Sequence, residues 1–289
     1  MTGKDGVSVL GIAGAVALVA LVAAAGGAGS AQVGGIPVFV SCAIVALLIQ
    51  WIAFVPAYRN QTEHYFDLTG SITYISLLLL GLLLAGADAR SLLIAGLVLI
   101  WAVRLGSFLF RRVRQDGSDT RFRSIKPDFL RFLMTWTLQG AWVLVTFAAG
   151  LAAITSSTLQ PLGWLALFGS LLWIVGFSIE VVADRQKRQF RLQADRETEF
   201  ITSGLWAWSR HPNYFGEILL WFGIALIALP VLSGWQYLTL ISPIFVIVLL
   251  TRISGIPMLE RRADKRWSED PLYQNYKRST PVLIPKPPG

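Results

Sequence analysis

The sequence predicts an all-α integral membrane protein, a helical bundle with seven or eight transmembrane helices. Three observations predict this class. Hydrophobic residues make up 54% of the 289 residues, and the mean hydropathy is +0.59. Apolar runs of the length needed to cross a bilayer, about 20 residues, recur along the whole chain. A soluble domain of this size carries more polar surface, so the composition excludes that class.

The predicted spans follow one another with short connections. Lys4 precedes the first run and small residues follow it, as in a signal peptide, but seven further spans favour a retained helix. Asp88, Ala89 and Arg90 separate the third run from the fourth. The spans are expected near residues 8–28, 36–56, 71–87, 91–110, 131–153, 162–183, 214–232 and 236–251.

The basic residues indicate the orientation. Segments 111–131, 185–211 and 253–289 together hold twenty of the twenty-five Lys and Arg residues. The alternate connections carry none; these are 29–35, 154–161 and 233–235. By the positive-inside rule the basic segments face the cytoplasm, which for a bacterial protein indicates the inner membrane. The net charge of +8 therefore reflects topology and an anionic ligand rather than nucleic acid.

The chain reads as a single membrane domain over 1–289, with N-terminal spans in 1–110 and cofactor-binding spans, loops and tail in 111–289. Cys42 is the one cysteine and sits inside an apolar run, so we expect no disulfide and no cysteine-based metal site. The Gly-rich stretch 25–35 is interpreted as a helix end and a short turn. The protein is expected to be a monomer in contact with membrane lipid.

The sixth span becomes charged near its end. Glu180, Asp184, Arg188 and Arg191 follow at steps of four, four and three, so they share one face of a helix. Glu180 lies about a turn deeper than the others, and an acid at that depth should face the protein interior. Paired arginines suit phosphate oxygens, and interleaved acids suit ribose hydroxyls or an amide. A dinucleotide carries all of these groups.

A polar motif, Gly204-Leu205-Trp206-Ala207-Trp208-Ser209-Arg210-His211-Pro212-Asn213-Tyr214-Phe215-Gly216-Glu217, precedes and opens the seventh span. Pro212 fits a helix start, where free N–H groups and the helix dipole favour an anion. Asn213 and Glu217 share a face, and Asn offers the donor and acceptor that a carboxamide needs. Arg210, His211 and Tyr214 are further candidates. No metal site is expected, since no ligand stands at metal spacing from His211.

The last span leads into a basic tail. Arg252 and Glu260 lie about two turns apart across a Gly-Pro break, and either could close over a bound ligand. Tyr273 and Tyr276 stand among basic residues, where aromatics serve as interfacial anchors or as ligand contacts. The tail then runs through Pro281-Val282-Leu283-Ile284-Pro285.

These residues together resemble the C-terminal half of the steroid 5-alpha-reductase family, in particular its bacterial multi-span branch. The resemblance is close over roughly 175–285 and loose before that. It implies an integral membrane oxidoreductase that uses NADPH to reduce the C=C bond of a 3-oxo-4-ene steroid or a similar enone lipid. It implies cofactor contacts from Asp184, Arg188, Arg191, Asn213 and Glu217, with Glu180 and Arg252 beside them. This chain departs from the family at one position, because Glu199 stands where the family has an arginine. Arg196 or a basic residue of 111–123 would then make the phosphate contact of that arginine.

Enone reduction also requires a donor at the carbonyl oxygen, where negative charge develops, and a proton for the alpha carbon. The family supplies these groups from its N-terminal half, where this chain aligns poorly. The nearest polar cluster here is Gln61-Thr62-Glu63-His64-Tyr65-Phe66-Asp67. Glu63, Tyr65 and Asp67 are therefore the candidate catalytic residues, with Gln139 a further polar group. A solvated loop is the alternative interpretation.

A second enzyme class remains open. The pattern Arg210-His211-Pro212-x-Tyr214-x-Gly216 with a later Glu260 is also similar to the isoprenylcysteine carboxyl methyltransferases and phospholipid methyltransferases, which use S-adenosylmethionine. Against them, this chain has one acid at Leu259-Glu260 where they have a pair. The face with Arg188 and Arg191 suits a diphosphate and has no counterpart in a sulfonium ligand. A transporter is a third alternative, and it would place polar residues mid-membrane across several spans. Here the polar residues gather at the cytoplasmic ends of the last three spans, which argues against transport.

Overall fold

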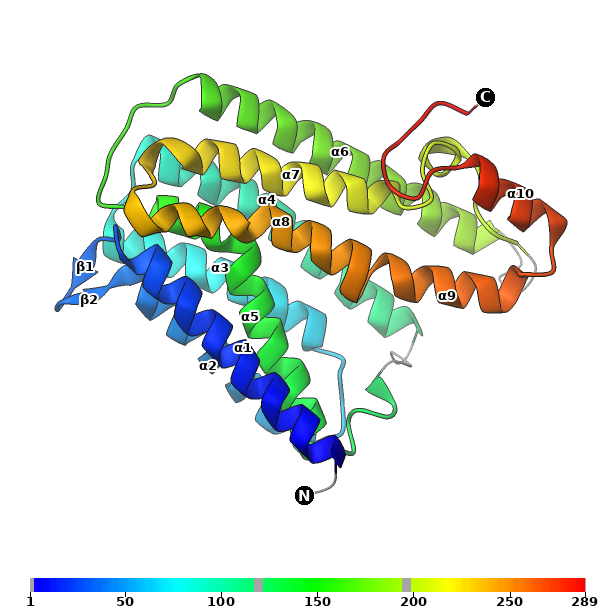
Figure 1. Ribbon diagram of the computed structural model, residues 1–289, viewed down its shortest axis with the longest axis horizontal. Coiled ribbons are helices and arrows are strands. Elements are labelled where there is room, and N and C mark those ends of the chain that lie inside the picture. The colour runs from blue at the N-terminus through cyan, green and yellow to red at the C-terminus, as the bar shows by residue number, and fades with distance from the viewer. Residues whose placement is uncertain (1–2, 117–121, 194–198, 289) are drawn as a thin grey trace. The chain divides into compact units, whose positions relative to one another are not determined.

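The computed structural model describes residues 3–116, 122–193 and 199–288. Within them, eight helical segments are long and apolar enough to cross a membrane. The predicted class is confirmed: the protein is an all-α integral membrane protein (Figure 1). The longer helices are α1 (Gly3–Gly27), α2 (Val38–Arg59), α3 (Phe66–Ala85), α4 (Ala89–Asp116), α5 (Phe129–Ile154), α6 (Trp164–Gln193) and α7 (Pro212–Ala228).

Shorter elements complete the chain. The helical ones are η2 (Gly204–Ala207), η3 (Leu229–Val231), η4 (Gly234–Leu240), α8 (Ile241–Val248), η5 (Leu249–Ile253), α9 (Ile256–Trp267) and α10 (Pro271–Ser279). A two-stranded antiparallel hairpin joins β1 (Gln32–Val33) to β2 (Ile36–Pro37). Gly34 and Gly35 turn it with φ of 58° and 80°, which glycine adopts without steric cost. The predicted turn in 25–35 is therefore a small hairpin.

The chain separates into two compact units. Unit 1 is Met1–Ala166 with Ile227–Ser242, and unit 2 is Leu167–Leu226 with Pro243–Gly289. Neither composition nor hydropathy indicates this division, and the single membrane domain stays a prediction. The residues expected to be catalytic belong to unit 1, and those expected to bind the cofactor belong to unit 2.

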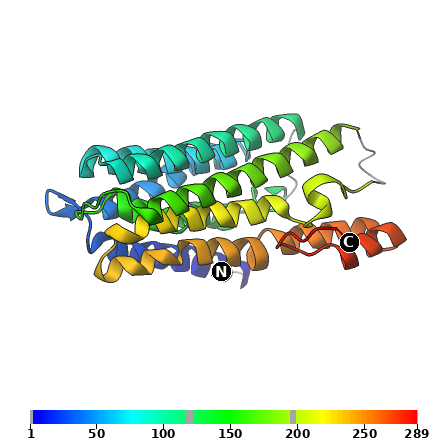
Figure 2. The ribbon, with the colours of Figure 1, turned by 90° about the horizontal axis from the view of Figure 1, so that it is seen from above.

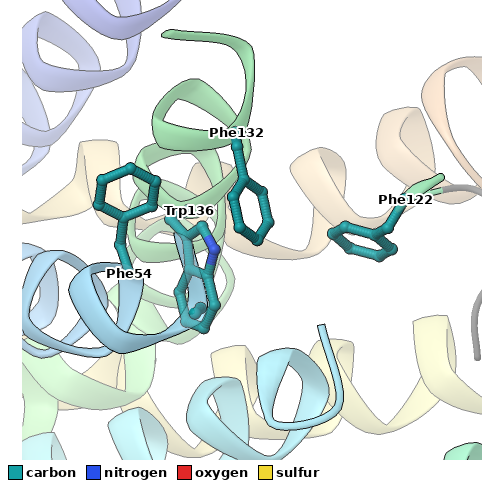
Figure 3. Packing of buried hydrophobic residues seen from close by; sticks show 5 residues of the cluster. Phe54, Phe122, Phe132 and Trp136 are labelled. Carbon is teal, nitrogen blue, oxygen red and sulfur yellow. The ribbon is translucent and has the colours of Figure 1, made fainter. Parts of the chain in front are cut away.

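Unit 1 is built around α5. This helix packs against α1, α2, α3 and α4, and Figure 1 shows it beside α1. Near its N-terminus lies an aromatic cluster of Phe54, Ala57, Phe122, Phe132 and Trp136, all buried. Figure 3 shows Phe54, Phe132 and Trp136 grouped, with Phe122 reaching toward Phe132 from the segment before α5. Edge-to-face contacts of this kind add to the burial energy of each ring.

The three connections without basic residues meet at one end of unit 1. Ala31 N donates to Thr155 O at 2.7 Å, and Ser156 Oγ donates to Val231 O at 3.0 Å. Gln236 Nε2 donates to Gly26 O at 3.2 Å. Charge placement had grouped these connections on one side of the membrane, and the hydrogen bonds show that they are neighbours.

The third and the last spans differ from the predicted ones. The third span begins at Phe66 rather than at 71, so Asp67 lies in the first turn of α3. The last span is not one regular helix: it starts as the tight turns of η4, continues as α8 and widens into the π-helical turn η5, which carries Arg252. Hydropathy marks an apolar run, but it does not distinguish these helix types.

In unit 2, α6 and α7 run side by side (Figures 1 and 2). Glycines on both helices permit a close approach. A Cβ atom at Gly216 would lie 2.5 Å from Gly176 O, and one at Gly223 would lie 2.5 Å from Gly169 O. Small residues that let backbones meet in this way are the usual basis of helix packing in membranes.

We predict that Gly223→Ala lowers the thermal unfolding midpoint of the detergent-solubilised protein. The new methyl group would meet the backbone of α6 at Gly169 and Trp173, and overpacking of this kind costs about 1–3 kcal/mol. Gly96→Ala is the matched control, because no atom lies within 4 Å of a Cβ at this glycine of α4. Equal midpoints for the two variants would contradict the close contact.

Candidate functional site

The glycine contact brings the predicted polar residues of α6 and α7 together. Gly216 packs against the backbone of Glu180, with its Cβ position 2.7 Å from Glu180 N. Three residues before Gly216, Asn213 Nδ2 donates to Asp184 Oδ1 at 3.2 Å. Glu180 is 3% exposed, which agrees with an acid that faces the protein interior. The structure therefore places Glu180, Asp184 and Asn213 on facing surfaces of these two helices.

Beyond Asp184, helix α6 continues for more than two turns. Arg188 and Arg191 lie on this extension and are exposed. Guanidinium groups are well suited to bind phosphate oxygens. Arg196, which was expected to replace a missing family arginine, lies outside the described residues, as do 117–121 of the basic segment 111–123.

A second polar cluster centres on Glu260 of α9. Its Oε1 atom lies 2.9 Å from His211 Nε2, and its Oε2 atom lies 3.2 Å from Arg210 and 3.8 Å from Lys277 Nζ. His211 also stacks on Tyr214, with ring centroids 5.7 Å apart. The structure thus joins four predicted residues (Arg210, His211, Tyr214 and Glu260) and adds Lys277, which the sequence did not indicate.

The His211 side chain is 6% exposed. Burial lowers the pKa of His211, and the hydrogen bond to Glu260 opposes that change in part. A neutral ring that donates Nε2–H to the carboxylate leaves Nδ1 as an acceptor. Among the described residues, no group hydrogen-bonds Nδ1, which is buried. This nitrogen is therefore a buried acceptor with no hydrogen-bond partner among the described residues.

The turn η2 fixes the approach to His211. Gly204 has φ of 61°, and Gln186 of α6 lies against it, accepting a hydrogen bond from Leu205 N at 2.9 Å. Trp206 is buried and its Nε1 donates to Ala183 O at 3.0 Å. Lys187 lies over the Trp206 ring, 4.3 Å from its centroid, within the range of a cation–π contact.

Two further predicted cofactor residues are Glu217 and Arg252. Glu217 is half-buried in the second turn of α7, one position after Gly216. Arg252 is exposed in the π-helical turn η5. Their part in cofactor binding stays a prediction.

The candidate catalytic residues lie around the start of α3 in unit 1. Glu63 is 3% exposed and pairs with Lys126, so it is a buried carboxylate held by an ammonium group rather than a group in a solvated loop. Tyr65 is 59% exposed and stacks on Phe110. Asp67 is half-buried. Gln139 Nε2 donates to Phe66 O at 3.0 Å, which places that residue beside the same segment.

Sequence reasoning missed three groups that the structure brings to these clusters. Lys126 lay in a segment interpreted as topogenic charge. Lys277 and Asp264 form an ion pair, and Tyr273 Oη donates to Asp264 Oδ1 at 2.9 Å. The alternating charges of α9 and α10 could have indicated this pair, but the same pattern is equally typical of solvent-exposed helices. Within the described residues, no group of three or more His, Cys, Asp or Glu side chains is placed to hold a metal ion.

We predict that the free energy of unfolding falls as the pH is lowered, because His211 takes up a proton more readily in the unfolded chain. The folded state binds a proton at His211 less readily than the unfolded chain, in which histidine titrates near the ordinary value of 6.5. The stabilisation is therefore present above that pH and is lost below it, by up to about 1.4 kcal/mol per pH unit. Thermal midpoints between pH 8 and 5 should fall more steeply for the parent protein than for His211→Gln. Parallel profiles would show that His211 has the same pKa in the folded and unfolded states, which would contradict the prediction.

Comparisons with known proteins bear on the identity of this site. The family profile described as "Protein of unknown function (DUF1295)" matches residues 53–280. A steroid 5-alpha-reductase of Gossypium hirsutum is 29% identical over 60% of this chain and 61% of its own length. A 3-oxo-5-alpha-steroid 4-dehydrogenase 1 of Rattus norvegicus is 28% identical over 41% of this chain and 40% of its own.

The Delta(14)-sterol reductase of Saccharomyces cerevisiae is 31% identical over 40% of this chain and 28% of its own length. These matches thus span less than two thirds of each relative. No solved structure matches. The profile, in contrast, spans both clusters and most of the sequence. This chain therefore belongs to the DUF1295 family, and its expected relationship to the steroid 5-alpha-reductases is confirmed.

Proposed function

We propose that this protein is a membrane reductase that uses NADPH to reduce a carbon–carbon double bond in a small lipophilic substrate, a steroid or a similar enone lipid. The observation that carries the proposal is the contact of Asp184 with Asn213, because it aligns the acidic and basic face of α6 with the polar start of α7. The names of the relatives, all reductases or dehydrogenases of steroids and sterols, support the same reaction class.

The residues of unit 2 fit NADPH chemically. Arg188 and Arg191 are exposed guanidinium groups of the kind that bind phosphate oxygens in pairs. Asn213 offers an amide, and the free N–H groups at the start of α7 favour an anion. His211 Nδ1, buried without a hydrogen-bond partner in the described chain, suits a ribose hydroxyl or a carboxamide N–H.

The basic segments supply the proposed orientation. Arg188, Arg191 and Arg210 belong to segment 185–211, and Lys277 belongs to 253–289, both rich in basic residues. By the positive-inside rule these segments face the cytoplasm, where NADPH is dissolved. For a bacterial cell the membrane would be the inner membrane, and the protein would act there as a monomer.

When bound, NADPH supplies a hydride for one carbon of the double bond. The chain must supply a hydrogen-bond donor for the oxygen of an enone, because negative charge develops there, and a proton for the neighbouring carbon. We assign these roles to the segment of Glu63, Tyr65 and Asp67. Of the three residues, Tyr65 is exposed and carries a hydroxyl group that can donate a hydrogen bond. Glu63 is paired with Lys126 and holds the segment in place.

We predict that Asn213→Ala and Arg191→Ala each raise the Kd for NADPH by at least about tenfold. Arg191→Ala removes a proposed hydrogen bond to a charged phosphate oxygen, which contributes roughly 1.5–3 kcal/mol. Asn213→Ala removes the amide proposed to contact the cofactor, together with its hydrogen bond to Asp184. Isothermal titration of the detergent-solubilised protein measures the effect. The matched control is Arg278→Ala, an exposed arginine of α10 whose Nε donates to Gln274 O. Unchanged affinity in both site variants would overturn the assignment of this pocket.

We predict that Tyr65→Phe leaves the Kd for NADPH unchanged and lowers turnover by roughly 10²-fold or more, since a positioned proton donor contributes about 10²–10⁴-fold. The assay is NADPH oxidation with an enone steroid. Tyr237→Phe is the control, because Tyr237 is also exposed in unit 1 but lies on η4. Parent-level turnover for Tyr65→Phe would remove this residue from the reaction.

A further inference from the structure

The C-terminal segment Pro281–Lys286 is joined to the residues just before α7. Arg210 N donates to Pro281 O at 2.9 Å, and Lys286 N donates to Trp208 O at 2.9 Å. The two segments therefore run antiparallel for this short stretch. Figure 1 shows the C-terminal tail beside the turn that precedes α7. We call Pro281–Lys286 the strap.

Ser209 lies between these two backbone bonds. Its side chain is fully buried, at 0% exposure. Its Oγ donates to Leu283 O of the strap at 2.9 Å, with Val282 O at 3.4 Å, and accepts a hydrogen bond from His211 N at 3.1 Å. One hydroxyl thus joins the strap to the backbone of His211.

His211 is consequently held at both ends. Its backbone N–H is bound by Ser209, and its ring is bound by Glu260 of α9. The following residue, Pro212, has no backbone N–H. The N–H of His211 is therefore the last one before α7, and the hydroxyl of Ser209 binds it. Helix α10 adds a parallel contact, because Tyr276 Oη donates to Trp206 O at 2.7 Å.

We propose that the strap and Ser209 position His211 against Glu260, so that Ser209 is a positioning residue for the ligand-binding end of α7. Without the hydroxyl, the backbone of His211 loses its anchor and the ring leaves Glu260 part of the time. This inference rests on the proposed function where it concerns NADPH. The placement of His211 can be measured without any ligand.

The experiment uses the two histidines of the chain, His64 and His211. The full-length protein is labelled with ¹³C at histidine Cε1, and the two resonances are followed by NMR as a function of pH, with His64→Gln giving the assignment. His64 is exposed. In the parent protein the His211 resonance should titrate below the ordinary histidine pKa of 6.5, because burial of the ring lowers its pKa.

Two variants remove the anchor. Ser209→Ala deletes the hydroxyl, with Ser203→Ala as its control, since Ser203 is exposed and makes no capping bond. Termination after Thr280 deletes the strap, with termination after Lys286 as its control. We expect both test variants, and neither control, to move the His211 titration upward, toward the ordinary histidine pKa of 6.5, because the ring becomes less buried. The Kd for NADPH should rise about tenfold, as the loss of one buried hydrogen bond allows.

Ser209→Ala tests the proposal even if the truncated chain fails to fold. A His211 titration identical in Ser209→Ala and parent protein would overturn the positioning role. If the titration moves but the parent protein binds no NADPH, the strap stands and the proposed function fails. If NADPH binds equally well to parent and Ser209→Ala although the titration moves, the inference fails for cofactor binding while the function stands.

Discussion

The close contact between α6 and α7 is the constraint on which the site of unit 2 depends. Gly176 and Gly216 each leave the position of a Cβ atom within 2.6 Å of backbone on the other helix. At that separation, side chains that flank the contact reach each other, as Asp184 and Asn213 do. Glu180 is buried for the same reason. A membrane helix pair with larger residues at these positions would stand too far apart for short polar side chains to meet.

The polar residues at this end of unit 2 form a connected network rather than separate ligands. Glu260 is approached by Arg210, His211 and Lys277, and Lys277 continues to Asp264. A buried or half-buried charge is stable only when it is paired and hydrogen-bonded. The network therefore ties α9, α10 and the start of α7 to one another. Unit 1 shows the same principle on a smaller scale, where Lys126 holds Glu63 beside the aromatic cluster.

Hydropathy and helical spacing were sufficient for the fold class, the spans and the face of α6 that carries Glu180 and Asp184, because each depends on local periodicity. They could not reveal contacts between distant segments. Nothing in the sequence around Ser209 indicates that its hydroxyl meets Leu283, and Lys126 resembles the other basic residues of its loop. Asp67 was placed in a loop because the polar stretch before it hides the start of α3. Tertiary contacts decided these cases.

The most direct test of the account is the reaction itself. The purified protein in detergent would be given NADPH and progesterone, an enone steroid, with NADPH absorbance and the steroid products followed together. In parallel, thermal unfolding would be compared with NADPH and with S-adenosylmethionine. The account predicts one dihydro product for each NADPH oxidised, and stabilisation by NADPH. Stabilisation by S-adenosylmethionine with no response to NADPH would contradict it and assign the chain to the membrane methyltransferases.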